Sequence, residues 1–284
     1  MIAVESLSKS FGRRQAVDQV SFQVAAGTCF GLIGPNGAGK TTTIRLLVGA
    51  LRPDAGQVRL AGRLEPGGPE ARRLVGLAPQ SLAIYEELTG RENLAFLGRL
   101  QGMGGRELQA RIDEVLELVG LARRGRERVA TYSGGMKRRL NLACGVIHRP
   151  RLLFLDEPTV GVDPQSRNWI FDNIESLRRG GTTVLYTTHY MEEAERLCDQ
   201  VAIMDRGRLI AQGTVAELVA AHGGASIMAA ELEGGESFRR ETENPLEDLA
   251  SLVQEGRRLL RLKVDRPGLE KVFLNLTGRS LRDL

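Results

Sequence analysis

The stretch GPNGAGKT at residues 34–41 decides the fold of this chain. It fits the spacing Gly-x-x-x-x-Gly-Lys-[Ser/Thr] in full. Glycines allow consecutive backbone N–H groups to point inward at phosphate oxygens, and the dipole of a following helix adds positive potential. The pattern therefore predicts a phosphate-binding loop between a strand and a helix.

The segments on either side of the loop agree with this prediction. CFGLIG at 29–34 is apolar throughout, as expected of a strand buried on both faces of a sheet. A helix is expected from Lys40, closed by Pro53, with an apolar face formed by Ile44, Leu47, Val48 and Leu51. VSFQV at 20–24 alternates instead, which is typical of a half-exposed antiparallel strand. Two kinds of sheet are thus expected.

The rest of the chain alternates between helical and strand patterns. Residues 89–148 hold helical patterns alone and begin with a capping box, TGRE at 89–92. LLFLD at 152–156 and TTVLYTTH at 182–189 indicate buried strands, with helices beginning at Asp163 and Met191, and residues 200–213 indicate a hairpin. We predict an α/β fold: a mostly parallel sheet, an antiparallel β subdomain and an inserted α-helical subdomain at about 89–148.

A small α+β C-terminal appendix is expected at 214–284, after a main domain at 1–213. Strands are expected at 225–233 and 257–264, and helices at 244–255 and 267–278. The last helix carries an apolar stripe formed by Leu269, Val272, Phe273 and Leu276. A regulatory or dimer-stabilising role is a hypothesis for this appendix, and ordinary core packing is the alternative.

Composition limits the class of protein. The 284 residues are 42% apolar, enough to fill a core, and the three cysteines form no Cys-x-x-Cys pair. No signal pattern opens the chain and no apolar run approaches a membrane span, so we expect a protein that is soluble when isolated. Residues 123–139 hold seven Arg or Lys against one Glu, whereas residues 217–248 hold eight acids against two Arg. A basic cluster is usually a solvated face, but this one borders a glycine-rich helix start.

Two carboxylates end a buried strand in RLLFLDEP at 151–158. Asp156 is placed to hold Mg²⁺, and Glu157 can accept a proton from an attacking water. In the phosphate loop, Lys40 is expected to reach the β and γ phosphates, and the Thr41 hydroxyl to bind Mg²⁺. Carboxylates at strand ends also serve as turn or cap residues, so the pair alone is a weak signal. Together with the phosphate loop it becomes a specific one.

A second glycine-rich helix start lies in TYSGGMKRRLNLACG at 131–145. Ser133 is suited to cap the helix, whose apolar residues Leu140, Cys144 and Ile147 face inward before Pro150. Glycines at 134 and 135 lower helix stability and leave the helix end bare, and a bare helix N-terminus binds anions. The helix start is therefore a candidate second phosphate site.

At this point the chain resembles the nucleotide-binding subunits of ABC transporters, over residues 1 to about 213. The resemblance implies a P-loop ATPase core that binds ATP and Mg²⁺, with Glu157, His189, Lys40 and Gln80 in catalysis. It places the Walker A loop at 34–42, the Q-loop at Gln80, the signature at 133–136, the D-loop at Asp163 and the switch histidine at His189. Nucleotide-binding residues would be Phe11, Gly34, Asn36, Gly37, Ala38, Gly39, Lys40, Thr41, Thr42, Ser133, Gly134, Gly135 and Asp163, and metal ligands Thr41, Gln80 and Asp156.

Each motif also has a plainer interpretation. Phe11 can be a core aromatic, Gln80 a loop amide and His189 a capping or packing residue. The signature departs from its commonest form, Leu-Ser-Gly-Gly-Gln, because Tyr132 and Met136 stand at its ends. Segments such as YSGGMKRRL at 132–140, PTVGVDPQSRN at 158–168 and VFLNLTGRSLRD at 272–283 are similar to the bacterial export branch, which includes drug and antibiotic exporters.

The resemblance implies the partners as well. We expect a head-to-tail homodimer in which each signature covers the other copy's ATP, and a separate transmembrane permease on whose cytoplasmic face the chain lies peripherally. No nucleic-acid partner is expected. A soluble ABC ATPase acting on DNA or ribosomes remains an alternative, although two cassettes or a long coiled coil would be expected there. A P-loop small-molecule kinase is a further alternative, which leaves the SGG helix and His189 without a role.

Overall fold

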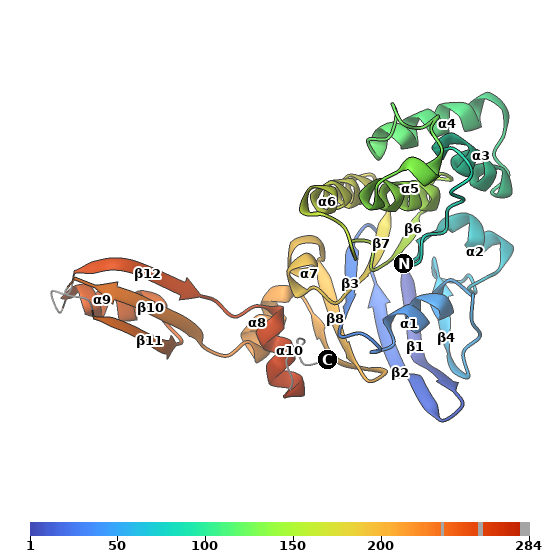
Figure 1. Ribbon diagram of the computed structural model, residues 1–284. Helices are drawn as coiled ribbons and strands as arrows, with labels where there is room; N and C mark the ends of the chain where they lie inside the picture. The colour runs from blue at the N-terminus through green and yellow to red at the C-terminus, as the bar shows by residue number, and fades with distance from the viewer. Residues whose placement is uncertain (234–235, 255–257, 279–284) are drawn as a thin grey trace. The chain divides into compact units, whose positions relative to one another are not determined.

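The computed structural model describes residues 1–233, 236–254 and 258–278 (Figure 1). The ends of the segments expected at 244–255, 257–264 and 272–283 lie partly outside these described residues. The chain divides into two compact units, Met1–Ala211 and Gln212–Leu284.

A six-stranded sheet forms the centre of the first unit. Its order is β5 (Val75–Ala78), β6 (Leu152–Asp156), β7 (Thr183–Thr188), β3 (Cys29–Ile33), β8 (Gln200–Asp205) and β9 (Arg208–Gly213). The pairs from β5 to β8 are all parallel. Both β3 and β6 are buried along their whole length, which confirms the parallel core expected from their uniform apolar sequence.

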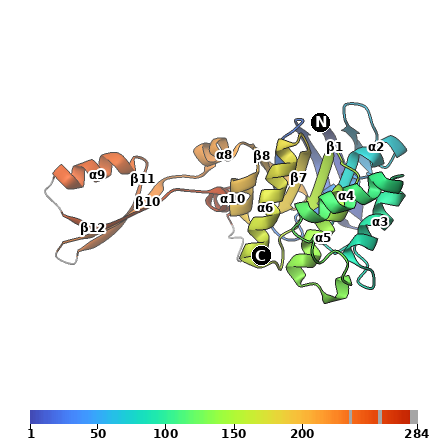
Figure 2. The ribbon, with the colours of Figure 1, turned by 90° about the horizontal axis from the view of Figure 1, so that it is seen from above.

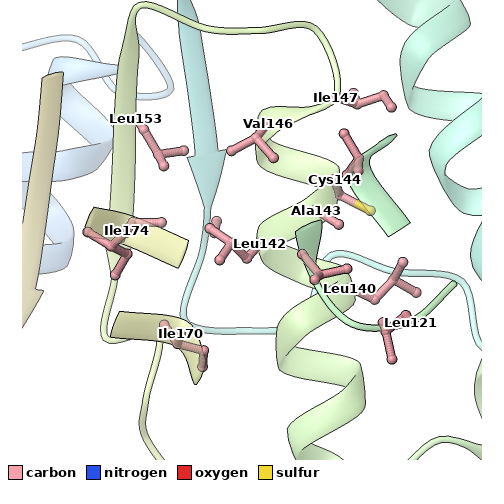
Figure 3. Close-up of a cluster of buried hydrophobic side chains, with 14 of the residues drawn as sticks. Leu121, Leu140, Leu142, Ala143, Cys144, Val146, Ile147, Leu153, Ile170 and Ile174 are labelled. Carbon is pink, nitrogen blue, oxygen red and sulfur yellow. The ribbon is translucent and has the colours of Figure 1, made fainter. Parts of the chain in front are cut away.

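Successive residues of these strands point to opposite faces of the sheet and enter two separate cores. In β6, Leu153 and Leu155 join one core, while Leu152 and Phe154 join the other. The first core contains the helix α5 (Gly134–Val146) and the helix α6 (Pro164–Arg179), and Figure 3 shows several of its side chains. The period of two along β6 is thus the reason that both faces of the sheet are covered.

The second core is closed by an antiparallel sheet of order β2 (Arg14–Val24), β1 (Ile2–Phe11) and β4 (Ala55–Leu60), together with α1 (Lys40–Leu47). This sheet confirms the expected antiparallel subdomain. The expectation that α1 continues to Pro53 is wrong, because the helix ends at Leu47 and the chain turns at Gly49, which has a positive φ of 75°. A left-handed residue at this point ends the helix.

Helices fill the chain between β5 and β6 in the described residues. They are α3 (Gly90–Leu100), α4 (Gly105–Leu118), the 3-10 turn η1 (Val129–Thr131) and α5. The expected capping box at 89–92 is present at the start of α3. α5 packs against both α4 and α6 (Figures 1 and 2). The short helices α2 (Pro69–Leu74) and α7 (Met191–Leu197) complete the first unit.

The second unit is an α+β structure, as expected. Its sheet has the order β11 (Ser237–Thr242), β10 (Ser226–Leu232) and β12 (Leu259–Asp265), and its helices are α8 (Val215–His222), α9 (Pro245–Gln254) and α10 (Leu269–Thr277). The expected stripe of α10 buries Leu269, Val272 and Phe273. Helix α10 packs on α8. Helix α8 and strand β11 are absent from the elements that were predicted from the sequence.

Among all helices that the structure describes, none is both long and apolar enough to cross a membrane.

Candidate functional site

Four neighbouring parallel strands deliver polar residues to one edge of the central sheet. Strand β3 leads into the loop 34–41, β6 ends at Asp156, β7 is followed by His189, and β5 is followed two residues later by Gln80. The carboxyl ends of parallel strands lie at the same edge, where ligands of α/β sheets bind. The topology therefore gathers residues that are far apart in the sequence.

The phosphate loop closes tightly around Lys40, which is 4% exposed. Its ammonium group donates to the carbonyls of Gly34 at 2.8 Å and Pro35 at 3.0 Å, and it lies 3.1 Å from Oε1 of Glu157. Gly39 at the N-cap of α1 has a φ of 112°, and a Cβ there would lie 2.3 Å from the carbonyl of Ala16. The loop thus needs glycine at this position both for its backbone angle and for space.

Glu157 is the centre of the polar cluster. Besides Lys40, its carboxylate accepts a hydrogen bond from Nε2 of Gln80 at 3.2 Å and lies 3.3 Å from Nδ1 of His189. The His189 nitrogen has no hydrogen-bond partner among the described residues, although it is buried. Glu157 itself has a φ of 47°, a strained value for a side chain other than glycine. Such strain is typical of positions held for function.

Asp156 is held beside the loop by two hydroxyl groups. Thr187 donates to its Oδ1 at 2.8 Å and Thr41 at 3.2 Å. Burial raises the pKa of Asp156 and lowers the pKa of Lys40, in the latter case against the opposing charge of Glu157. Hydroxyl and carboxylate oxygens are the donors that Mg²⁺ prefers. Thr41 and Asp156 therefore form a chemically suitable pair of magnesium ligands, whereas the amide nitrogen of Gln80 is directed to Glu157.

A cavity of about 490 Å³ lies over the loop. Its lining includes many of the residues predicted to bind nucleotide or act on it, namely Phe11, Asn36, Gly37, Gly39, Lys40, Thr41, Thr42, Gln80 and Glu157. Phe11 is half exposed, as a stacking platform requires and a core aromatic does not. Gly34 and Ala38 belong to the same loop but are buried beneath this surface.

The SGG helix start is separate from this lining. Ser133 caps α5, as expected, and its Oγ accepts a hydrogen bond from the backbone N–H of Met136 at 3.2 Å. Ser133 and Gly134 are exposed, whereas Gly135 is buried beside α6, so that a Cβ there would lie 2.3 Å from Oγ of Ser166. Asp163 caps α6 by accepting from the N–H of Ser166 at 2.9 Å. The signature and D-loop residues are thus close to each other but not part of the cavity.

The three basic residues that follow the SGG motif contact other parts of the fold. Lys137 pairs with Glu86 at 2.7 Å, and Arg138 donates to the carbonyl of Gln80. Arg139 donates to the carbonyl of Val119 at 3.3 Å and lies over the ring of Trp169. The side chains that follow the SGG motif therefore stiffen the helix start and link it to the Gln80 segment.

Arg14 and Thr187 are polar residues at the site that were not predicted. Arg14 lines the cavity and donates to the carbonyl of Gly37 at 3.3 Å, and it is the cross-strand partner of Phe11. The two-residue turn in SFGRRQAV, Gly12 and Arg13, was the available signal for this pairing. Thr187, whose hydroxyl is the second donor to Asp156, lies near the end of β7. The strand was predicted from its apolar residues, and its threonines gave no separate signal of a role at the site.

Comparisons with known proteins agree with this geometry. The family model described as ABC transporter matches residues 17–160. The chain is 41% identical over 311 residues to the linearmycin resistance ATP-binding protein of Bacillus subtilis, covering 100% of each. It is 42% identical over 306 residues to a daunorubicin resistance ATP-binding protein of Streptomyces coeruleorubidus, covering 99% of this chain and 97% of the relative. It is 41% identical over 296 residues to the Nod factor export ATP-binding protein I of Mesorhizobium japonicum, covering 98% and 86%.

Solved structures also resemble this chain. An ATP-binding subunit of an ABC transporter superposes with a TM-score of 0.71 at 32% identity, covering 78% of this chain and 93% of the other. A nucleotide-free ATP-binding cassette from an ABC transporter gives a TM-score of 0.68 at 26% identity, covering 75% and 91%. The phosphate loop, the paired carboxylates and these relatives lead to one conclusion: the chain belongs to the ABC transporter family, as one of its ATP-binding and ATP-hydrolysing subunits.

Proposed function

We propose that this subunit uses ATP hydrolysis to energise export of a drug-like, antibiotic-like or lipid-like compound through a separate membrane-spanning subunit. The observation that carries the catalytic part is the meeting of Lys40, Gln80 and His189 at the single carboxylate of Glu157. The direction of transport is supported by relatives named for antibiotic resistance and for Nod factor export.

ATP binding in the cavity would begin with an exchange of partners at Lys40. Its ammonium group now contacts two loop carbonyls and Glu157. The β and γ phosphates offer stronger acceptors, so the ammonium turns toward them while Phe11 stacks on the base and the loop N–H groups bind phosphate oxygens. This exchange frees the carboxylate of Glu157 from its positive partner and makes it available as a base.

Hydrolysis then needs a base and a held water molecule. Glu157 accepts a proton as the water oxygen bonds to the γ phosphorus and the bond from this phosphorus to the β–γ bridging oxygen breaks. ADP and inorganic phosphate are the products. Gln80 and His189 both lie against Oε2 of Glu157 and would orient this carboxylate. His189 would also donate to the γ phosphate.

Mg²⁺ would be held by Thr41 and Asp156, whose oxygens already lie 3.2 Å apart. Gln80, which we predicted as a further ligand, can supply its amide oxygen while its nitrogen donates to Glu157. When bound, the ion neutralises phosphate charge. It would also offset the cost of keeping the Asp156 carboxylate charged in a buried place.

The exposed start of α5 supports a second copy of this chain as partner, arranged head to tail. The Ser133 hydroxyl accepts from Met136, so its proton is available to an outside acceptor. The N–H groups at Gly134 and Gly135 and the positive end of the helix favour the same kind of ligand. The triphosphate bound to the other copy would supply that anion, with Asp163 beside it at the start of α6.

A membrane permease is the other proposed partner, which would place the subunit peripherally at the cytoplasmic face. An exposed aromatic pair, Tyr85 and Phe96, packs edge to face shortly after Gln80, at a centroid distance of 5.4 Å. Exposed aromatics beside a residue that senses nucleotide are suited to contact a permease. The appendix at 214–284 would stabilise the dimer or regulate it, through the side chains that its sheet and helices leave exposed, such as Leu246 and Leu260.

The test is to purify the chain with its associated proteins and to follow the γ phosphate of ATP. We expect release of inorganic phosphate and co-purification of a multi-span membrane protein. Transfer of phosphate to a small acceptor would favour a kinase instead. Co-purification with DNA or ribosomes, and with no membrane protein, would favour the soluble ABC ATPase.

A further inference from the structure

Glu193 is a buried carboxylate for which neither the motifs nor the proposed mechanism provides a role. It lies on α7, is 3% exposed, and accepts three hydroxyl donors. Oε1 accepts from Thr159 at 2.8 Å, and Oε2 accepts from Tyr186 at 2.7 Å and from Thr188 at 2.8 Å. Burying a carboxylate is costly unless donors satisfy it, so this cluster needs a reason to exist.

The three donors come from the two segments that carry Glu157 and His189. Thr159 lies two residues after Glu157, and Thr188 directly precedes His189. The Thr188 hydroxyl donates to Glu193 and accepts a hydrogen bond from the backbone N–H of Tyr190 at 2.9 Å. Because Thr188 and Tyr190 flank His189, this hydroxyl connects the residues before and after the histidine. Glu193 therefore connects the chain just after the proposed base with the turn that presents the imidazole.

The Glu157 segment is also fixed by Thr187, which lies between Tyr186 and Thr188 in β7. The backbone N–H of Glu157 donates to the carbonyl and the hydroxyl of Thr187, at 3.2 and 3.0 Å. The strained φ of Glu157 persists only if contacts on both sides hold it. Thr187 supplies one set of contacts, and Thr159 with Glu193 supplies the other.

The same carboxylate also reaches the helix that begins with Asp163. Oε1 of Glu193 lies 3.6 Å from Nε of Arg167 on α6, and the guanidinium of Arg167 lies over the ring of Tyr190 at 5.4 Å. Since Arg167 is one turn from the Asp163 cap, Glu193 links the histidine turn with the start of α6.

We propose that Glu193 is a positioning residue, which sets the imidazole of His189 relative to the carboxylate of Glu157 and so controls the rate of ATP hydrolysis. This inference rests on the proposed function of the Glu157 site. Glu193 does not contact the reacting atoms, and it acts through Thr159 and Thr188. A misplacement of about 1 Å in such a pair can reduce a rate by up to about 100-fold.

The test compares Glu193→Gln with Glu192→Gln, its exposed neighbour on the same short helix. An amide keeps the shape but replaces one acceptor oxygen by a donor, which then faces a donating hydroxyl. We expect Glu193→Gln to lower kcat about 10-fold, with the KM for ATP within about twofold, because the phosphate loop is untouched. Glu192→Gln should keep the wild-type kcat and KM.

A second comparison separates positioning from general loss of fold. In a His189→Ala background there is no imidazole to position, so Glu193→Gln should lower kcat by less than about twofold more. If Glu193→Gln acted only by damaging the fold, it would lower kcat by the same factor in the wild-type and the His189→Ala backgrounds. If Glu193→Gln fails to fold, Tyr186→Phe removes one donor at nearly constant volume and should lower kcat by about fivefold at most, with the same dependence on His189.

Wild-type kcat in both Glu193→Gln and Tyr186→Phe, or an equal loss with and without His189, would overturn the inference. A wild-type protein that releases no phosphate from ATP would instead overturn the proposed function, and the inference with it.

Discussion

The two glycine-rich helix starts of this protein, at α1 and at α5, use the same local chemistry and have opposite surroundings. The loop before α1 buries Lys40 to 4% exposure and satisfies it with carbonyls and a carboxylate of its own fold. At α5, Ser133 and Gly134 are exposed, and the Ser133 Oγ accepts a hydrogen bond from the N–H of Met136. The first start thus has partners for its charged side chain within its own fold, whereas the second is open to the outside, where we propose that it receives an anion.

The largest effect is expected from a change that removes the carboxylate beside the first helix start and leaves both starts intact. Glu157→Gln keeps the shape of the side chain but removes the base, so ATP turnover should fall by about 10² to 10⁴. ATP binding and ATP-dependent dimerisation should remain, because the loop and the α5 start are unchanged. Phosphate release and size-exclusion chromatography with ATP measure the two properties, and undiminished turnover would contradict the role of Glu157.

A smaller effect is expected from a charge placed at the second site. Asp is a good N-cap, so Ser133→Asp should leave the melting temperature of the protein unchanged or slightly raised. Its negative charge would repel a phosphate, and ATP-dependent dimerisation should weaken about 10- to 100-fold. Ser133→Asn is the matched control, since it has the same shape and caps a helix without charge. Equal dimerisation of the Asp and Asn variants would mean that Ser133 serves as a cap alone.

The smallest effect is expected from alanine substitutions at Gly134 and Gly135. They separate the role of a glycine in packing from its role in leaving the helix start open to an anion. A Cβ at Gly135 would overlap Ser166, so Gly135→Ala should destabilise the fold by about 1 to 3 kcal/mol. A Cβ at Gly134 meets nothing within 4 Å, so Gly134→Ala should leave stability nearly unchanged and weaken only the approach of the anion. Chemical denaturation compares the two stabilities, and a stability loss at Gly134 as large as that at Gly135 would contradict this distinction.

Much of the fold could be predicted because hydrophobic periodicity and helix-capping residues are signals that a short stretch of sequence carries by itself. The strands at 29–33 and 152–156 are almost wholly apolar, the caps Thr89 and Ser133 are present as predicted, and a helix begins after Asp163 as predicted. Strand β11 was missed because SFRRET is mostly polar and lies at a sheet edge, and α8 was missed although Thr214 and Glu217 form a capping box.

The site was less accessible to sequence reasoning than the fold. The residue types were identified from the motifs, but their pairing joins positions far apart, such as Lys40 and Glu157, and depends on strand order. The apolar residues of α7 place Glu193 nearer the buried face than Glu192, but the sequence does not indicate which hydroxyl groups bond to it. These bonds form only when three segments fold around one carboxylate.

The most direct test of the central claim mixes two variants, each of which is expected to have low ATP turnover because one part of its ATP site is impaired. Lys40→Met disables the phosphate loop and keeps the α5 start, whereas Ser133→Asp disables the α5 start and keeps the loop. If the open helix start of one copy completes the ATP site of another, the mixture regains ATP turnover, because a mixed dimer contains one site with both parts intact. A mixture whose turnover stays as low as that of either variant alone would contradict the account.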